Sequence, residues 1–320
     1  MPTDQDVLAV VNADAGSAAQ PQVEAAVAAM RAAGPPSAQV ELVATTSLEH
    51  LAETLRGLAG RRLVIIGGDG SIRAGVQSLH DVGALRAAGP IGIVPLGTAN
   101  DLARTLGLPQ DPADAAHLAM SGTPHGMAVL VAEDGVVAVN SVHVGVGAVA
   151  ARKADRIKPV LQRVRLGVLA YPVGALAAGL THRSWRLRVR VDGVDQQRPG
   201  ERLLMVAIGL GGTVGGGVPL VPGADPRDAM ADIVVSGAVA PLARLVYAAQ
   251  LTRGAHVRRP DVRTARGLMI EVEAAPGTSF PTNLDGEVRG PYTARCWEFR
   301  PEAWSAIAPQ EAEDVAGAAA

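Results

Sequence analysis

The first 110 residues alternate short apolar segments with segments of helical spacing. The apolar segments are continuous, which is typical of strands that are buried on both faces of a parallel sheet. Helical patterns between such strands place helices on both faces. The sequence therefore predicts an N-terminal three-layer α/β domain, with strands at 7–12, 39–44, 63–66 and 91–94 and a first helix at 21–33.

The second expected helix carries its own start signal. Thr46 and Glu49 have the spacing of a capping box, in which both side chains bond backbone amides of the first turn. Four leucines at helical spacing are expected to face the core, namely those at 48, 51, 55 and 58.

The pattern changes after about residue 125. Strand-like segments separated by turn residues follow one another, and 186–191 alternates polar and apolar residues, as a half-solvated antiparallel strand does. One helical stretch, about 150–180, interrupts this pattern. We expect an α/β domain at 1–125, an antiparallel β-sandwich domain at 126–309 and a disordered tail at 310–320.

Small and hydroxyl residues occupy the strand-to-helix junctions of the first domain. In a parallel sheet all such junctions lie at one edge, where ligands bind. Here they comprise 12–16, 45–46, 67–71 and 95–101. Glycines let phosphate oxygens approach the backbone, and helix N-termini favour anions. Asp69 lies among these amides but cannot donate to an anion, which is explained if a magnesium ion bridges it to phosphates.

Three of the candidate site motifs also have a purely structural interpretation. Gly67–Gly70 is equally typical of a tight strand-to-helix turn with Ser71 as N-cap. Thr98 and Asp101 have the spacing of a capping pair. Asp285-Gly286 is typical of a β-hairpin turn.

Two segments in fixed order carry a family resemblance. LVIIGGDGS at 63–71, followed by IGIVPLGTANDLAR at 91–104, resembles the catalytic domain of diacylglycerol kinases and their bacterial lipid kinase relatives. Further segments extend the resemblance along the chain, at 166–174, 215–217, 222–224, 228 and 283–287.

The resemblance implies a role for each matching residue. Asp69 would organise the catalytic magnesium, together with Asp101, and Glu287 would be the general base. Asp228, with the backbone carbonyls of Asp225 and Met230, would bind a second magnesium ion. The residues that would hold ATP are Asn12, Gly16, Thr45, Gly67, Gly68, Asp69, Gly70, Ser71, Arg73, Gly97, Thr98, Asn100 and Asp101.

The resemblance also implies an activity. The chain would be an ATP-dependent lipid kinase that uses Mg²⁺ and transfers the γ-phosphoryl group to the hydroxyl of diacylglycerol or a similar lipid alcohol. Its partners would be the lipid substrate and, transiently, a membrane surface; a homodimer is left open. Residues 1–6 lack the basic and apolar regions of a signal peptide, so a cytoplasmic enzyme that is peripheral to the membrane during turnover is expected.

Several positions depart from the family pattern. Ser71 and Arg73 stand where threonine and asparagine are usual, and the Arg73 charge could neutralise phosphate directly. Met127 and Ala128 lie where some members carry an acidic residue that assists magnesium. The other departures are Ala99, Leu210 and Ala229.

Other functions were weighed against the lipid kinase. A sphingoid-base or ceramide kinase, an enzyme similar to NAD kinase and a non-catalytic nucleotide- or lipid-binding member of the fold remain alternatives. An NAD-dependent oxidoreductase is disfavoured, because 145–150 lacks the acidic residue expected after a second strand. A net charge of −2 argues against nucleic-acid binding, and the single cysteine, Cys296, excludes an internal disulfide framework.

Overall fold

The computed structural model describes residues 6–13, 19–146, 148–149, 184–238 and 240–310. The helix expected at about 150–180, the matching segment at 166–174 and residues 311–320 of the expected tail lie outside the described residues.

The N-terminal sheet contains four parallel strands in the order β2-β1-β3-β4. These are β1 (Val7–Asn12), β2 (Val40–Thr45), β3 (Arg62–Gly67) and β4 (Pro90–Pro95). The helices of this half are α1 (Gln20–Ala33), α2 (Leu48–Arg56), α3 (Asp69–Asp81), α4 (Asp101–Thr105) and α5 (Pro112–Ser121).

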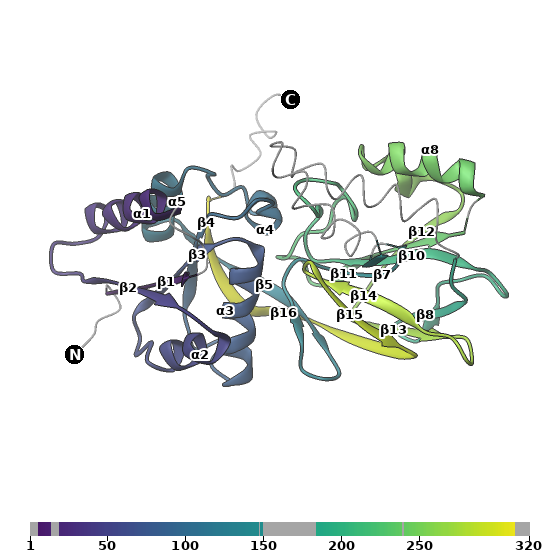
Figure 1. Cartoon of the computed structure of the whole chain (residues 1–320), viewed down its shortest axis with the longest axis horizontal. Helices are drawn as coiled ribbons and strands as arrows, with labels where there is room; N and C mark the ends of the chain where they lie inside the picture. The colour runs from purple at the N-terminus through teal and green to yellow at the C-terminus, as the bar shows by residue number, and fades with distance from the viewer. Residues whose placement is uncertain (1–5, 14–18, 147, 150–183, 239, 311–320) are drawn as a thin grey trace, which may run out of the picture.

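Strand β1 shows why this domain has three layers. Leu8 and Val10 belong to the core that includes residues of α2 and α3, whereas Val7 and Ala9 belong to the core that includes residues of α1 and α5. Successive side chains of a strand point to opposite faces, so a continuous apolar strand requires a cover on each side. The expected three-layer α/β domain is confirmed (Figure 1).

The exact helix starts differ from those expected. Ser47, not Thr46, is the N-cap of α2, and its hydroxyl accepts a hydrogen bond from the His50 amide at 3.1 Å. Leu48 therefore lies at the first helical position, with 65% of its surface exposed rather than in the core. Helix α3 begins at Asp69 with Gly68 as its N-cap, so Ser71 lies within the first turn.

The second half of the chain forms two facing antiparallel layers, which confirms the expected β-sandwich. One layer contains β8 (Leu187–Val191), β9 (Val194–Asp195) and β13 (Met269–Ala274). The other has the order β12-β11-β10-β7-β14-β15. Its strands are β7 (Ser141–Gly145), β10 (Leu203–Gly209), β11 (Ala231–Gly237), β12 (Val262–Gly267), β14 (Phe280–Leu284) and β15 (Glu287–Tyr292). Helix α8 (Pro241–Leu251) and the 3₁₀ turn η4 (Ala255–Arg258) precede β12.

The alternation expected at 186–191 is present in β8. Leu187, Val189 and Val191 are buried in the core between the two layers, and Arg188 is exposed.

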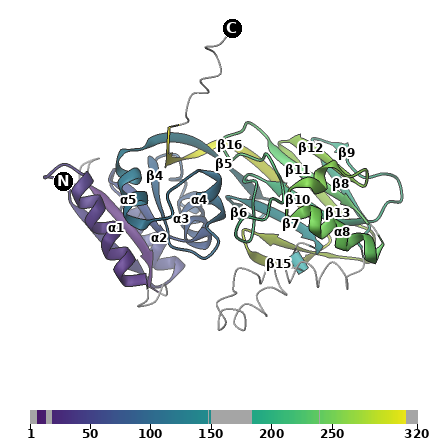
Figure 2. The same cartoon turned by 90° about the horizontal axis from the view of Figure 1, so that it is seen from above.

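The long strand β16 (Ala294–Ala308) joins the two halves (Figures 1 and 2). Its first part pairs with β13, and its last part pairs in parallel with β4 through Ser305 and Ala306. β5 (Thr123–Ala132) runs antiparallel along it and also pairs with the short β6 (Val137–Ala138). The register shifts between Arg300 and Trp304, where Glu302 has a φ of +47°. The sheet is thereby continuous from β2 to β9.

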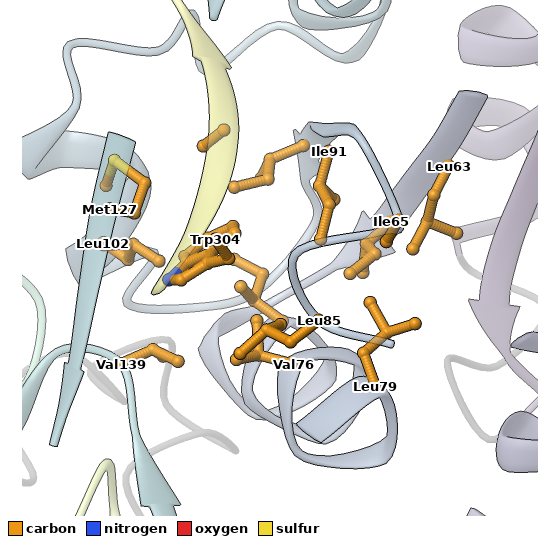
Figure 3. Packing of buried hydrophobic residues seen from close by; sticks show 14 of the residues in the cluster. Leu63, Ile65, Val76, Leu79, Leu85, Ile91, Leu102, Met127, Val139 and Trp304 are labelled. Carbon is orange, nitrogen blue, oxygen red and sulfur yellow. The ribbon is translucent and has the colours of Figure 1, made fainter. Parts of the chain in front are cut away.

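Trp304 follows this irregularity and anchors β16 in the first domain. Its ring belongs to the core that includes Leu102 and Met127 (Figure 3). Its indole N–H donates to the Ala128 carbonyl at 3.1 Å, so no polar atom of the ring is left unsatisfied.

We predict that Trp304→Ala lowers the free energy of unfolding by about 3–5 kcal/mol, because it removes a large buried ring and leaves a cavity. Urea unfolding measures this loss. The matched control is Arg300→Ala, which changes an exposed side chain on the same strand and should cost less than about 1 kcal/mol. A similar loss in both variants would contradict the anchoring role of Trp304.

Candidate active site

Two glycine-containing loops meet at the carboxyl edge of the parallel sheet. A Cβ atom added to Gly68 would lie 2.8 Å from the Gly97 Cα atom, and one added to Gly97 would lie 2.6 Å from the Gly68 Cα atom. Any larger residue at either position would push the two loops apart. The close approach of the two loops therefore requires glycine at both positions.

Asp69 joins the same two loops through its carboxylate. Its Oδ2 accepts the Asp101 amide at 3.1 Å and its Oδ1 accepts the Leu102 amide at 3.0 Å, so it satisfies two amides at the start of α4. The capping pair expected between Thr98 and Asp101 is therefore wrong. Burial raises the pKa of Asp69, and the bonds from these two amides counteract part of that rise.

Asp101 in turn binds the glycine-rich loop of the second domain. Its carboxylate accepts the amides of Gly216 and Gly217 at 3.1 and 2.9 Å and the Thr213 hydroxyl at 3.3 Å. Both glycines have positive φ angles, of +90° and +108°, which lets consecutive amides point at one carboxylate. The observed contacts of Asp101 are thus with protein donors, and its expected role in organising magnesium stays a prediction.

A pocket of about 280 Å³ opens beside these loops. Residues from both domains line it, since Glu287 of β15 faces it together with the first turns of α3. Apolar residues of the sheet and of α2 form part of its wall. The lining residues are Val10, Val11, Asn12, Thr45, Thr46, Ser47, Leu48, Leu51, Ile65, Gly70, Ser71, Arg73, Ala74 and Glu287.

Glu287 is held by two arginines. One carboxylate oxygen pairs with Arg73 of α3, and the other accepts Arg289 at 2.9 Å. The Arg73 side chain is only 10% exposed, whereas that of Glu287 is 48% exposed. The pair therefore links the two domains across the pocket, with the cation on its buried side.

Asp285 fixes the hairpin that presents Glu287. The turn has φ angles of +47° at Asp285 and +95° at Gly286, which confirms the expected hairpin turn. The partly buried Asp285 carboxylate accepts the amides of Val139, Asn140 and Ser141, at 2.6 to 3.0 Å. Burial raises its pKa to about 6, although these amides and the Arg73 charge lower it. Sequence reasoning found the turn but missed this anchoring role.

Sequence reasoning also missed His143, which is buried on β7 beside the same hairpin. It is in register with Asn283 of β14, and its Nε2 lies 3.1 Å from the Ser141 hydroxyl. Its Nδ1 has no hydrogen-bond partner within the part of the chain that the structure describes. Burial lowers the pKa of His143 to about 4, so the ring is neutral at pH 7.

Several expected site residues lie outside the pocket. Thr98 is exposed, and Asn100 is buried with its side-chain oxygen accepting the Gly97 amide at 2.8 Å. Gly16 lies outside the described residues. Asn12, Thr45, Gly70, Ser71, Arg73 and Glu287 are the expected residues that the structure brings together around one pocket.

The residues expected to bind a second magnesium ion lie in the loop before β11. Asp228 is paired with Arg266, and Asp225 accepts Arg227 Nε at 2.8 Å. No three His, Cys, Asp or Glu side chains gather as a metal site within the described ranges. The arginines already neutralise these carboxylates, so the side chains present do not fit a bound cation here. The second magnesium site stays a prediction without support from this geometry.

Three of the positions at which this chain departs from the family pattern carry buried apolar residues. Met127 lies in the core of the first domain, while Ala128 and Leu210 lie in the core of the sandwich, each with at most 1% exposure. An aspartate at 127 or 128 would be buried without a partner, which is costly. At these two positions this chain therefore carries buried core residues and no carboxylate that could assist a magnesium ion.

Comparison with known proteins agrees with this architecture. Residues 6–132 match the model of the diacylglycerol kinase catalytic domain, and residues 140–308 match that of the YegS C-terminal NAD kinase beta sandwich-like domain. A protein of Pseudomonas aeruginosa (strain UCBPP-PA14) named "Probable lipid kinase YegS-like" is 33% identical over 83% of each chain. A diacylglycerol kinase of Mycobacterium tuberculosis (strain H37Rv) is 28% identical over 72% of each chain.

Solved structures show the same fold. A diacylglycerol kinase from Bacillus anthracis (strain Sterne) superposes with a TM-score of 0.74 at 20% identity, over 95% of this chain and 97% of that one. The two family models and the 33% identical relative show that the chain belongs to the diacylglycerol kinase and YegS-like lipid kinase family. No helix among the described residues is both long and apolar enough to cross a membrane.

The buried histidine gives a pH dependence of stability. The pKa of His143 is about 4 in the folded state and 6.5 when exposed, so the unfolded chain binds the proton first as the pH falls. We predict that the wild type loses stability relative to His143→Gln between pH 6.5 and 4, by about 1.4 kcal/mol for each pH unit.

Urea unfolding of both proteins at pH 7, 6 and 5 measures this difference. Because the other titrating groups are shared, only the difference between the two curves is attributed to His143. Parallel pH curves would contradict a neutral, buried ring.

Proposed function

We propose that this protein transfers the γ-phosphoryl group of ATP to the hydroxyl of diacylglycerol or a similar lipid alcohol. The observation that carries the proposal is the shared pocket, in which Glu287 of the second domain faces the glycine turn and the first helical turns of the first domain. Family membership and the names of the relatives support the lipid as acceptor.

The pocket has the groups that a triphosphate requires. Gly70 and Ser71 lie in the first turn of α3, whose N-terminus favours an anion, and the Arg73 guanidinium adds a buried positive charge. Hydroxyls of Thr46 and Ser47 and the apolar side chains of Leu48 and Leu51 line the other wall. This combination suits a ligand with both an anionic and an apolar part.

Asp69 is the carboxylate that would hold a magnesium ion, and it would do so through bound water, because it does not line the pocket and both of its oxygens already accept backbone amides. A magnesium ion at this place would neutralise phosphate charge during transfer.

Glu287 is the proposed general base. Its carboxylate takes the proton of the lipid hydroxyl while that oxygen forms a bond to the γ-phosphorus. The bond between the γ-phosphorus and the bridging oxygen breaks, and ADP leaves with its electron pair. The protonated carboxyl then returns its proton to solvent.

A single assay tests this function. The protein is incubated with labelled ATP and magnesium in mixed micelles that contain diacylglycerol, ceramide, a sphingoid base or no lipid, with NAD as a soluble acceptor. We expect label in a lipid product, dependent on magnesium. Transfer to NAD alone would favour the alternative NAD kinase activity, and no transfer to any acceptor would favour a non-catalytic binding protein.

We predict that Glu287→Gln lowers turnover by about a hundred- to ten-thousand-fold, the usual contribution of a general base. The matched control is Glu298→Gln, which neutralises a carboxylate of similar exposure on β16 and should keep wild-type turnover. Equal turnover in the two variants would remove Glu287 from the chemistry.

Asp69→Asn should also abolish transfer. Because this substitution weakens a cap of α4, the thermal stability of the variant must be measured alongside its turnover.

A further inference from the structure

The ion pair between Arg73 and Glu287 joins the buried guanidinium that lines the pocket to the proposed base. Arg73 points from the second turn of α3, and Glu287 begins β15, so neither is local to the other in sequence. Both line the same pocket of about 280 Å³. A phosphate entering this pocket would meet a guanidinium that already donates one hydrogen bond to a carboxylate.

The guanidinium is only partly satisfied by this pair. Arg73 Nε is buried and has no hydrogen-bond partner in the described ranges of the chain. A phosphoryl group offers three oxygens, and the fork of an arginine can bind two of them at once. A terminal phosphoryl group therefore satisfies the buried cation more completely than the single contact with Glu287 does.

Glu287 has a second partner that would hold it when Arg73 leaves. Arg289 donates to its other oxygen at 2.9 Å from the same strand and does not line the pocket. The carboxylate can therefore stay on its hairpin while its pocket-facing oxygen becomes free to accept a proton.

We propose that Arg73 is a triphosphate sensor that releases the base. Before nucleotide binds, Arg73 pairs with Glu287 and occupies its pocket-facing oxygen. The γ-phosphoryl group of ATP takes over the Arg73 hydrogen bonds, and Glu287 is freed only when the group to be transferred is present. ADP lacks the γ-phosphoryl group and leaves the pair intact. This inference rests on the proposed function, because it specifies the order of nucleotide binding and base release within that reaction.

The exchange has a thermodynamic consequence that can be measured. If Glu287 and the γ-phosphoryl group compete for one guanidinium, removing the Glu287 charge must strengthen ATP binding. A partly exposed ion pair contributes little, so the expected gain is about fivefold. Removing Arg73 loses a charge-assisted hydrogen bond and should weaken ATP binding about 10- to 100-fold.

Calorimetric titration tests the exchange with magnesium and either ADP or an ATP analogue whose β,γ-bridge cannot be cleaved. The proteins are the wild type, Arg73→Gln, Glu287→Gln, the double variant and Arg300→Gln. We expect Glu287→Gln to bind the analogue more tightly, Arg73→Gln to bind it more weakly and neither to change ADP affinity. The gain from Glu287→Gln should vanish in the double variant, because the shared group is absent.

Arg300→Gln is the matched control, since it removes the charge of an exposed arginine that pairs with Glu298 on β16 and does not line the pocket. It should change analogue affinity by less than about threefold. If Arg73→Gln does not fold, the analogue affinity of Glu287→Gln still tests the exchange. The Glu287 side chain is half-exposed, so this substitution is not expected to prevent folding. Unchanged analogue affinity in Glu287→Gln, or an equal gain for ADP, would overturn the exchange while leaving lipid phosphorylation intact. Absence of nucleotide binding in every protein would overturn the proposed function and the exchange together.

Discussion

Three carboxylates that accept backbone amides fix the loops around the pocket, and one of them, Asp101, joins the first domain to the second. Asp69 fixes the start of α4, Asp101 at that start fixes the loop at Gly216, and Asp285 fixes the entrance to β7. Each bond joins elements that are far apart in the chain. A charged acceptor makes stronger hydrogen bonds than a neutral one, so these few contacts determine how the loops lie.

Strand β16 runs through both domains and therefore connects them covalently, in addition to the polar contacts of the carboxylates. The same strand pairs with β13 in the sandwich and with β4 in the first sheet, and Trp304 fixes its bend. The hairpin that carries Glu287 is thus placed relative to α3 by both the sheet and the carboxylates. This rigid placement is what a pocket built from two domains needs for phosphoryl transfer, which depends mainly on positioning and charge.

The first domain could be predicted closely because its signals are local. Continuous apolar segments gave the strands, and β1 has the expected bounds of Val7–Asn12. The cap of α2 was misplaced by one residue, and the start of α4 was mistaken because its partner, Asp69, is 32 positions away. In the second domain β16 was not predicted, because charges and Pro301 interrupt its apolar pattern.

The candidate site could be predicted in part, because its motifs are local segments of the sequence, whereas the contacts between them are not. The family resemblance identified Arg73 and Glu287 separately, and the pocket brings both together with Ser71 and Thr45. Their ion pair spans 214 positions, and no local pattern indicates it. His143 and the anchoring contacts of Asp285 were missed for a similar reason, since burial and register are properties of the folded sheet.

A crystal structure with magnesium and a non-cleavable ATP analogue tests the central claim most directly, which is that both domains build one nucleotide site around Arg73 and Glu287. The account predicts triphosphate density in this pocket, with Arg73 bonded to the γ-phosphoryl group and Glu287 bonded to Arg289 alone. Nucleotide bound away from this pocket, or Arg73 still paired with Glu287 in the presence of the γ-phosphoryl group, would contradict it.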